Sequence, residues 1–312
     1  MPLSEFALIQ RFFCNQNTKS KSTRIGIGDD CALIAIPDGY ELAITTDTMV
    51  ENVHFFAGTD PKDLGHKLLA VNLSDLASMG AKPLSVTLAL ALPSVDESWL
   101  AEFSSGFLAL AKRYSVDLIG GDTTSGPLTL TVQALGLVPR GQALLRSTAK
   151  AGDFIFMTGK LGQAGLGLKI RQGYNCSNPE AALTRFNTPY PQVETGLELL
   201  EIANACIDIS DGLTGDLGHI LEQSQIGACL DWDALPLSEE VLAYIQATGD
   251  WTMPLVAGDD YELCFTVSPE KAAKLTIDCQ KIGIIQSESG LRLNKSGRIQ
   301  PLQVKGFEHF SI

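Results

Sequence analysis

Aspartates at the ends of apolar segments are the residues of this sequence whose type and spacing could support chemistry. They stand beside Gly, Ser or Thr in parts of the chain that lie far apart: 26–30, 45–47, 120–122, 208–212 and 257–260. Carboxylate and hydroxyl oxygens form a hard ligand set of the kind that Mg²⁺, Mn²⁺ and Ca²⁺ prefer. Strand-end Asp-Gly pairs are also ordinary turns and caps, and for any one segment alone that is the better interpretation.

Asp75 differs from the others because it lies inside a predicted helix. That helix begins at Asp60-Pro61, with Asp60 as its cap, and runs to about Met79. Apolar residues surround nearly its whole circumference, which predicts a helix buried on most sides and an Asp75 carboxylate shielded from solvent. An unpaired buried carboxylate costs several kcal/mol, so it must be protonated, paired with a base or bound to a cation. Lys and Arg are scarce near these segments, which weakens the ion-pair option. We therefore expect the acidic side chains to meet in one pocket.

Strand periodicity pairs some of these oxygen donors. Thr45 and Asp47 share one face of their strand, and Asp208 and Ser210 share one face of theirs. Divalent ions gathered by an acidic protein allow it to bind a triphosphate, because the ions bridge phosphate oxygens and neutralise their charge. The pattern therefore favours a metal-assisted nucleotide site.

The usual nucleotide-binding motifs are absent from the sequence. Residues 152–160 lack P-loop spacing and the Ser or Thr that should follow the lysine, and residues 162–167 do not form G-x-G-x-x-G. Arg146 is a candidate phosphate contact and equally a surface arginine. His54 is a weaker candidate for binding an anionic substrate.

Composition excludes several classes of protein. The 312 residues carry 36 acidic and 23 basic side chains, a net charge of −13 that disfavours nucleic-acid and membrane-surface binding. No run approaches 18 apolar residues and the start has no basic leader, so we expect neither a membrane span nor a signal peptide. The seven cysteines are widely spread and never form C-x-x-C, which favours buried free thiols in a reducing cytoplasm.

Strands and helices alternate in both halves, which predicts an α/β (α+β) fold of two domains, each a mixed sheet with helices. We predict domains at 1–139 and 153–312, joined by a linker at 140–152 where the periodicity lapses. Strands are expected at 31–36, 41–46, 86–92, 117–120, 128–138, 154–158, 206–209, 226–232, 263–267 and 280–285. Beyond the helix at 60–79, helices are expected at 98–114, 193–203, 212–223, 238–248 and 269–275.

Eight segments of the chain form a set: GIGDDCA (26–32), TTDTMV (45–50), VHF (53–55), AVNLSDLASMGA (70–81), GGDT (120–123), IDISDGL (207–213), GDDYEL (258–263) and GFEHF (306–310). Together these segments resemble the thiamine-monophosphate kinase family, of the aminoimidazole ribonucleotide synthetase-like superfamily. They occur in order over essentially the whole chain. As a set they are highly specific, although several occur individually across the superfamily.

The resemblance implies ATP-dependent phosphorylation of thiamine monophosphate to thiamine diphosphate, by a homodimer that associates through its first domains. It implies Mg²⁺ ligands at Asp30, Thr45, Thr46, Asp47, Asp75, Asp122, Asp208 and Asp211. It implies ATP contacts at Gly121, Asp122, Arg146 and Ser210, and substrate contacts at His54, Asp259 and Phe307. The family commonly has Glu where this chain has Asp259, which is one methylene shorter.

We expect direct in-line transfer, in which the terminal phosphate oxygen of the substrate attacks the γ-phosphorus of ATP. That oxygen is already ionised at neutral pH, so no general base is needed, and positioning and metal charge should supply the rate. The sequence offers no convincing Ser-His-Asp or Cys-His arrangement, which agrees with this expectation.

Two alternatives share the aspartates. Sister enzymes act on a formyl amidine or on selenide; selenophosphate synthetases usually carry a reactive Cys or selenocysteine with a Lys near the N-terminus, and hydrogenase-maturation relatives end in cysteine. Here Cys14 lies in an apolar helix, which disfavours a selenophosphate synthetase. The sequence ends Phe310-Ser311-Ile312, which disfavours a hydrogenase-maturation relative. A calcium-binding structural module is the non-enzymatic alternative, but the linear D-x-[DN]-x-[DN]-G loop is missing.

Overall fold

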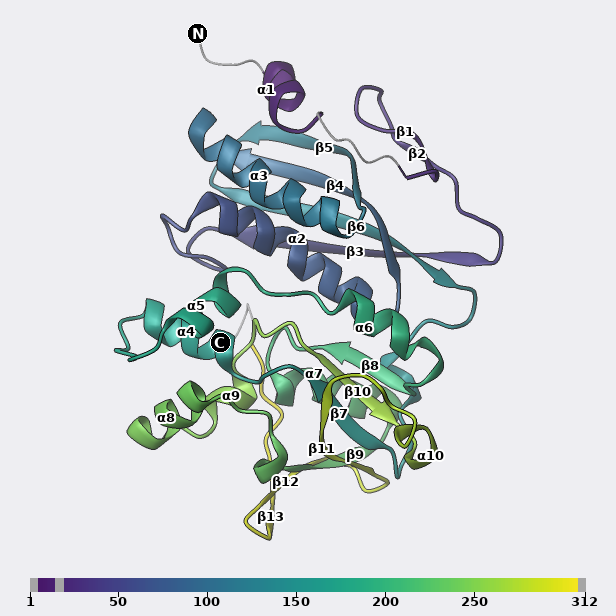
Figure 1. Ribbon diagram of the computed structural model, residues 1–312, viewed down its shortest axis with the longest axis vertical. Helices are drawn as coiled ribbons and strands as arrows, with labels where there is room; N and C mark the ends of the chain where they lie inside the picture. The colour runs from purple at the N-terminus through teal and green to yellow at the C-terminus, as the bar shows by residue number, and fades with distance from the viewer. Residues whose placement is uncertain (1–4, 15–19, 308–312) are drawn as a thin grey trace. The chain divides into compact units, whose positions relative to one another are not determined.

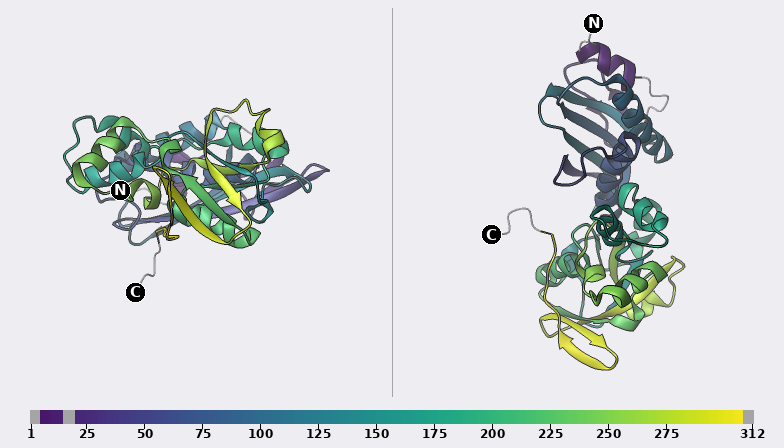
Figure 2. Two further views of the ribbon diagram at one scale, coloured as in Figure 1. Left: turned by 90° about the horizontal axis from the view of Figure 1, so that it is seen from below. Right: turned by 90° about the vertical axis from the view of Figure 1, so that its left-hand side faces the viewer.

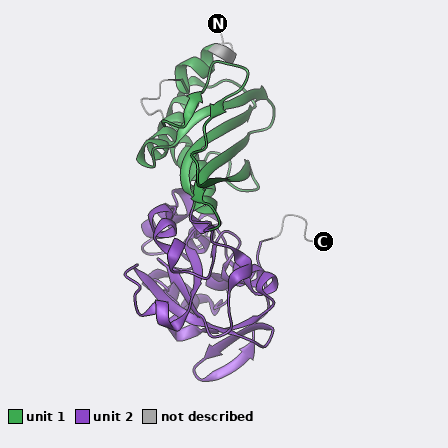
Figure 3. Ribbon diagram, turned by 90° about the vertical axis from the view of Figure 1, so that its right-hand side faces the viewer, with its two compact units in different colours: residues 1–76, 81–141 green, residues 77–80, 142–312 purple. Residues whose placement is uncertain are grey.

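The computed structural model describes residues 5–14 and 20–307. The chain divides into two compact units (Figure 3). Unit 1 comprises residues 1–76 and 81–141, and unit 2 comprises residues 77–80 and 142–312. The boundary between Gly141 and Gln142 falls within the range for which the sequence predicts a linker. Among the helices of the described residues, none is long and apolar enough to span a bilayer.

Unit 1 is built on a four-stranded sheet of order β3-β6-β4-β5, in which only β4 and β5 run parallel. Its strands are β3 (Tyr40–Val50), β4 (Lys82–Leu92), β5 (Asp117–Ser125) and β6 (Thr129–Pro139). Helices α2 (Pro61–Ser78) and α3 (Glu97–Arg113) cover one face of this sheet (Figures 1 and 2). Alternate residues of β4 and β6 are buried beneath them, as period-2 patterning requires.

The start of α2 confirms the predicted cap. Asp60 Oδ1 accepts hydrogen bonds from the backbone amides of Lys62 (2.8 Å) and Asp63 (3.4 Å), and Pro61 is the first helical residue. Almost every following side chain is buried, so the prediction of a helix covered on most sides is confirmed. Helix α3 begins one residue earlier than expected, because Asp96 caps it by accepting from the amides of Ser98 and Trp99.

A short two-stranded sheet precedes β3. It pairs β1 (Thr23–Ile25) with β2 (Leu33–Ile34), so the strand expected at 31–36 is shorter, and β1 is a strand that the sequence analysis did not predict. Asp117 explains β1: its Oδ2 accepts from the backbone amide of Ser20 and from Thr23 Oγ1, both at 2.7 Å. Helix α1 (Glu5–Phe12) completes unit 1.

Unit 2 contains a seven-stranded sheet of order β13-β12-β9-β11-β7-β10-β8, in which β12 and β9 are the parallel pair. The strands are β7 (Phe154–Thr158), β8 (Ala205–Asp208), β9 (Gly227–Asp231), β10 (Leu263–Val267), β11 (Cys279–Gln286), β12 (Gly290–Lys295) and β13 (Arg298–Pro301). Both sheets are mixed and carry helices, so the predicted fold class is confirmed. The hairpin of β12 and β13 was not predicted, because β13 is exposed at every residue and has no apolar alternation.

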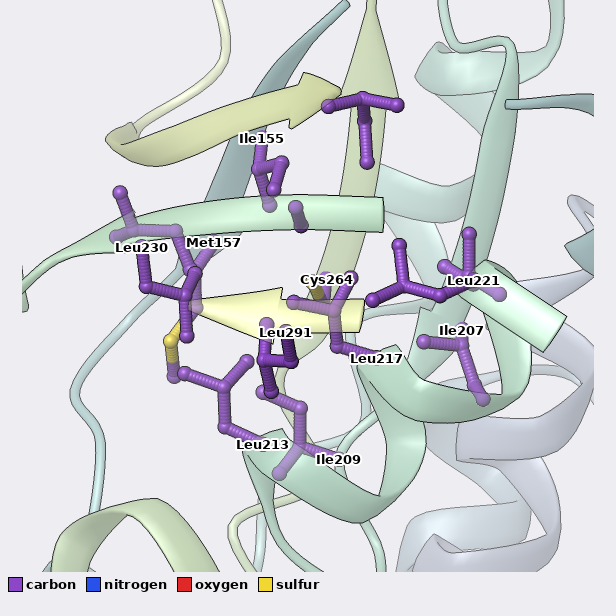
Figure 4. Close-up of a cluster of buried hydrophobic side chains, with 14 of the residues drawn as sticks. Ile155, Met157, Ile207, Ile209, Leu213, Leu217, Leu221, Leu230, Cys264 and Leu291 are labelled. Carbon is purple, nitrogen blue, oxygen red and sulfur yellow. The ribbon is translucent and has the colours of Figure 1, made fainter. Parts of the chain in front are cut away.

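The helices of unit 2 form two packing groups. Helix α7 (Leu213–Ser224) places Leu213, Leu217 and Leu221 against buried strand residues such as Ile155 and Leu230 (Figure 4). A second apolar cluster joins α4 (Gln163–Arg171), α5 (Glu180–Asn187), α8 (Glu239–Thr248) and α9 (Met253–Val256). The remaining short elements are α6 (Val193–Glu198), α10 (Pro269–Ala272), η1 (Arg146–Thr148), η2 (Leu199–Glu201) and η3 (Trp232–Ala234).

Candidate functional site

The first group of predicted site residues joins β3 to α2 in unit 1. Thr45 and Asp47 pair with buried residues of β6 and therefore face the helix-covered side of the sheet, as strand parity predicts. The Thr45 hydroxyl donates a hydrogen bond to Asp75 Oδ2. Thr46 pairs with exposed Gln133, so its hydroxyl lies on the opposite face and does not join this group. The group thus brings together hard oxygen donors from a strand and a helix.

The expectation that Asp75 is shielded from solvent is wrong. Its side chain is half-buried, whereas its neighbours Ser74 and Leu76 are buried. The reason is its partner strand: β3 is an edge strand of the sheet, so a helix residue that reaches it is not enclosed from every side. Half-exposure keeps the Asp75 carboxylate accessible to a ligand.

A second group lines a cavity of about 530 Å³ in unit 1. Asp30 of the loop between β1 and β2, and Gly121 and Asp122 of β5, line its polar side, while Leu88 and Phe13 are among its apolar walls. A Cβ at Gly121 would lie 1.8 Å from the Leu88 carbonyl oxygen, so only glycine allows this approach of β5 to β4. The structure therefore brings together two predicted metal ligands and a predicted ATP contact from segments about 90 residues apart in the sequence.

The two groups of unit 1 are separate. Asp47, Val132, Leu88 and Gly121 form one row across the sheet, so Asp47 and Gly121 are three strand spacings, roughly 14 Å, apart. Asp47 and Asp122 therefore do not share a coordination sphere within the unit, and the expectation that the acidic side chains meet in one pocket is wrong for the residues of unit 1. In residues 5–14 and 20–307, no three His, Cys, Asp or Glu side chains are close enough together to hold a metal ion by themselves.

His54 follows β3 in a tight turn. Its backbone amide donates to the Val50 carbonyl (2.9 Å), and its ring Nδ1 accepts from the Val50 amide (3.0 Å). An accepting Nδ1 places the proton of the neutral ring on Nε2 and fixes the ring's orientation. The half-buried imidazole is thus held in one tautomer, with a donor at Nε2.

In unit 2, three segments meet after the end of β8. The backbone amide of Asp259 donates to the Ser210 carbonyl (2.9 Å), and the amide of Phe307 donates to the Asp211 carbonyl (3.1 Å). Asp208, the last residue of β8, is buried, while Ser210 and Asp211 are half-buried. The structure therefore gathers predicted metal, ATP and substrate residues from 208–211, 259 and 307 in one place.

Glycines permit these close approaches. A Cβ at Gly258 would lie 2.1 Å from the Ser210 carbonyl oxygen, and a Cβ at Gly215 would lie 2.9 Å from the Cα of Gly306. The C-terminal segment is also fastened to α7 by Thr214 Oγ1, which donates to the Lys305 carbonyl (2.6 Å). Phe307 is 54% exposed at the end of this segment. Residues 308–310 of the GFEHF segment lie outside the described residues.

Two buried carboxyls of unit 2 were not singled out from the sequence. Burial, and secondarily the charge of Asp211, raises the pKa of Asp216 to about 7; its Oδ2 accepts from the Asp211 amide (3.0 Å). Burial raises the pKa of Asp260 to about 6, although its oxygens accept from the amides of Gly162 and Ala164 at the start of α4. Their position beside strand-end aspartates is a signal that could have identified them.

Arg146 lies in η1 with an exposed side chain. Its carbonyl accepts from Ser224 Oγ (2.9 Å), which ties η1 to the end of α7. Its positive charge lowers the pKa of buried Asp216, which opposes the effect of burial on that carboxyl. Arg146 therefore contributes positive charge to the region of Asp211 and Asp216.

An ion pair that sequence reasoning missed is formed by Glu262, the last residue of the stretch 259–262, which we call the Asp259 segment. Fully buried Glu262 pairs with Arg185 of α5 and accepts from Gln192 Nε2 (2.8 Å) and from the Thr158 hydroxyl. Burial lowers the pKa of the Arg185 guanidinium. No local pattern links these side chains, because they come from four segments of the chain that pack together only in the fold.

The donors on both units suit a hard divalent cation. Six of the eight predicted ligands lie in unit 1 and two in unit 2, and all of them offer carboxylate or hydroxyl oxygen. Mg²⁺ is typically held by one or two carboxylates together with substrate phosphates and water, so small groups of oxygen donors fit it without a complete protein cage.

Comparison with known proteins gives a consistent result. Two domain families match: AIR synthase related protein, N-terminal domain, over residues 28–138, and AIR synthase related protein, C-terminal domain, over residues 150–293. The chain is 44% identical to the thiamine-monophosphate kinase of Haemophilus influenzae over 326 residues, covering 99% of each chain.

Solved structures agree with the sequence comparison. The crystal structure of thiamine-monophosphate kinase from Stenotrophomonas maltophilia is 42% identical, with a TM-score of 0.84, covering 94% of this chain and 98% of that one. A second structure, AaThiL complexed with AMPPCP and TMP, is 28% identical with a TM-score of 0.80, covering 88% of this chain and 89% of that one.

Proposed function

The chain belongs to the thiamine-monophosphate kinase family, and on that premise we propose that it transfers the γ-phosphoryl group of ATP to thiamine monophosphate. The products are thiamine diphosphate and ADP. The observation that carries this proposal is the match over 99% of both chains to a thiamine-monophosphate kinase. The solved relative that holds AMPPCP, an ATP analogue, together with TMP supports both substrates.

We propose that Mg²⁺ assists the reaction. The residues that would hold it through side-chain oxygens are Asp30, Thr45, Asp47, Asp75, Asp122, Asp208 and Asp211. The hydroxyl of Thr46 lies on the opposite face of β3, so it is not among them. When bound, Mg²⁺ supplies the positive charge that this acidic chain lacks and neutralises phosphate oxygens during transfer. The hydrogen bond between Thr45 and Asp75 supports a shared role for β3 and α2.

The proposed ATP contacts are Gly121, Asp122, Arg146 and Ser210. Gly121 leaves its backbone exposed to a phosphate, and exposed Arg146 carries a guanidinium suited to phosphate oxygens. The proposed substrate contacts are His54, Asp259 and Phe307. A half-buried imidazole with a donor at Nε2 suits a phosphate oxygen, while a carboxylate and an aromatic face suit the cationic thiamine ring.

The transfer needs positioning rather than proton removal. An ionised oxygen of thiamine monophosphate forms a bond to the γ-phosphorus as the bond from that phosphorus to the bridging oxygen of ADP breaks. The attacking oxygen carries no proton at neutral pH, so no residue is assigned as general base. The chain's side chains bind and orient the two phosphate groups in line, which is where the rate enhancement arises.

The direct test is formation of thiamine diphosphate from purified protein, ATP, Mg²⁺ and thiamine monophosphate, followed by fluorescence after oxidation to thiochrome diphosphate. We expect product that requires both substrates, and inhibition by EDTA that excess Mg²⁺ reverses. Absence of product from folded protein would contradict the kinase proposal. Product that was insensitive to EDTA would contradict only the role of the metal.

We propose a homodimer formed through unit 1. The face of its sheet opposite α2 and α3 presents Ile44, 58% exposed, beside Thr46 and Thr48. Tyr40, 42% exposed, lies on the same face of β3, and two large exposed apolar side chains on one strand face support burial against a second copy. We expect sedimentation to give twice the chain mass and Ile44→Asp to reduce it; a monomeric wild-type chain would contradict this proposal.

We propose that the protein acts in the reducing cytoplasm. All seven cysteines are free thiols, which suits a reducing compartment. The expectation of buried packing residues holds for Cys206, Cys229 and Cys264, whereas Cys31 is exposed and the other three are partly exposed. Cell fractionation of the tagged chain tests this location.

A further inference from the structure

The backbone of the Asp259 segment adopts an uncommon conformation. Asp259 has φ 68° and Tyr261 has φ 48°, so two non-glycine residues in three occupy the left-handed region. Such backbone conformations are unfavourable for residues other than glycine and persist only where the surroundings fix them, often at ligand sites. The surroundings of this segment should therefore contain strong anchors.

Asp260 and Glu262, which alternate with Asp259 and Tyr261 along the chain, fix the segment in place. Asp260 is fully buried and accepts from the amides of Gly162 (2.5 Å) and Ala164 (3.0 Å). Glu262 is fully buried and forms the ion pair with Arg185. The segment is thus held on one side by the interactions of two buried carboxylates. Loss of the amide hydrogen bonds to Asp260 or of the ion pair of Glu262 would leave a buried charge without a partner, which is costly.

Backbone hydrogen bonds fix the segment on its other side. The Tyr261 amide donates to the Ile209 carbonyl (2.8 Å), and the Ile209 amide donates to the Glu262 carbonyl (2.8 Å). These bonds, with the one from Asp259 to Ser210, fasten the segment to the stretch that follows β8. The left-handed residues are consequently held in a fixed place.

This backbone directs the Tyr261 side chain back to Asp259. The tyrosine ring is 9% exposed, and its hydroxyl donates a hydrogen bond of 3.0 Å to Asp259 Oδ1. Hydrogen bonds to an ionised acceptor are stronger than those between neutral groups, and a packed tyrosine has few rotamers to lose. The hydroxyl therefore restricts the rotation of a half-buried carboxylate beside Ser210.

We propose that Tyr261 is a positioning residue for thiamine monophosphate: its hydroxyl holds the Asp259 carboxylate in the orientation that binds the substrate. This inference rests on the proposed function, in which Asp259 contacts thiamine monophosphate. Tyr261 itself acts through Asp259. The strained backbone is retained because it is the conformation that brings the two side chains together.

The test compares two tyrosines of unit 2 that donate to an aspartate two or six residues away. Tyr261→Phe removes the bond to Asp259, and the control Tyr244→Phe removes the bond from buried Tyr244 to Asp250 Oδ2 (3.2 Å). We expect Tyr261→Phe to raise the KM for thiamine monophosphate roughly three- to tenfold, the effect of one hydrogen bond to a charged group. The KM for ATP and kcat should stay within about twofold, and Tyr244→Phe should leave all three constants unchanged.

A double-mutant cycle with Asp259→Ala measures the coupling. Once Asp259 is truncated, we expect Tyr261→Phe to have no further effect on the KM for thiamine monophosphate. Additive effects, an equal rise in both KM values, or an unchanged KM for thiamine monophosphate would each overturn the proposal. So would a Tyr261→Phe chain that unfolds under conditions where Tyr244→Phe stays folded, because that assigns Tyr261 to stability.

The wild-type assay separates this inference from the function on which it rests. If the wild-type chain makes no thiamine diphosphate, both fall. If it is active and Tyr261→Phe behaves like the control, only the positioning role falls.

Discussion

The two units hold their candidate residues by different means. In unit 1, Thr45, Asp47 and Asp75 project from a regular strand and a regular helix, and a side-chain hydrogen bond links Thr45 to Asp75. In unit 2, Ser210, Asp211, Asp259 and Phe307 lie on irregular segments joined by backbone hydrogen bonds. Regular elements fix a side chain through the fold as a whole, whereas the segments of unit 2 depend on local backbone contacts. Substitutions in unit 1 should therefore remove a functional group and leave the backbone in place. Substitutions at the backbone contacts of unit 2 should displace the site residues themselves.

The largest effect is expected where a backbone contact of unit 2 is opened. Gly258→Ala places a Cβ 2.1 Å from the Ser210 carbonyl oxygen, so Asp259 must move away from Ser210. A displacement of about 1 Å at a site can cost roughly a hundredfold in rate, and overpacking costs about 1–3 kcal/mol. We expect turnover to fall at least that far, with a lower melting temperature.

Gly126→Ala is the matched control in unit 1. Its Cβ would meet only Ala91 Cβ, at an ordinary 3.5 Å. Turnover and melting temperature should match wild type. Comparable losses in both variants would mean that glycine substitution harms this chain generally, and the contrast between the units would fail.

Asp75→Asn is the corresponding change in unit 1. Asparagine can still accept the Thr45 hydroxyl, so the fold should be retained, while the negative charge offered to a metal is lost. We expect turnover to fall roughly a hundredfold at limiting Mg²⁺, with the melting temperature unchanged. Asp38→Asn, at an exposed turn residue, should leave turnover alone. Near-normal turnover of Asp75→Asn at limiting Mg²⁺ would remove Asp75 from the proposed ligands.

Phe307→Ala should have a smaller and more selective effect. Because the ring is 54% exposed, its removal should change stability by less than about 0.5 kcal/mol. Loss of an aromatic face for the thiamine ring should raise the KM for thiamine monophosphate up to about tenfold and leave the KM for ATP unchanged. Steady-state kinetics with each substrate varied in turn decides the point, and equal KM values in variant and wild type would argue against ring contact.

The smallest effect on activity is expected from the titration of Asp260. This titration should change the free energy of unfolding with pH rather than turnover. Its pKa of about 6 in the folded chain exceeds the ordinary value of 3.8 because the carboxyl is buried. Between pH 4 and 6 the folded chain therefore keeps a proton that the unfolded chain has released. Raising the pH through this window should lower the free energy of unfolding by about 3 kcal/mol from this group.

Asp260→Asn provides the comparison, because asparagine does not titrate. The difference in urea-unfolding free energy between wild type and variant should shift against wild type as the pH rises from 4 to about 6.5. A difference that stays constant over this range would show that Asp260 is ionised throughout, as its two amide hydrogen bonds alone would favour.

Local patterns in the sequence were sufficient for much of the framework. Strand β7 occupies the predicted residues 154–158, and the cap at Asp60 follows from one Asp-Pro pair. Alternation along β3 correctly placed Thr45 and Asp47 on one face. These features depend on neighbours within a few residues, which is the range over which a single sequence carries a readable signal.

Features that depend on distant partners were not predictable in this way. The Glu262 and Arg185 pair and the contact of Gly215 with Gly306 arise from packing between distant segments that no local periodicity connects. The half-exposure of Asp75 likewise follows from the edge position of β3, a property of strand order rather than of the helix sequence.

The packing of residues 304–306, the C-terminal tail, against α7 has a consequence for how this part of the chain unfolds locally. Gly215 and Gly218 each weaken an isolated helix by about 1 kcal/mol relative to alanine, and residues 304–306 occupy the space where their side chains would be. Helix and tail thus support each other and should open as one cooperative unit. Amide hydrogens in the first turns of α7 should exchange with deuterium at the rate of those in the tail, and a protease cut ahead of Leu302 should speed both.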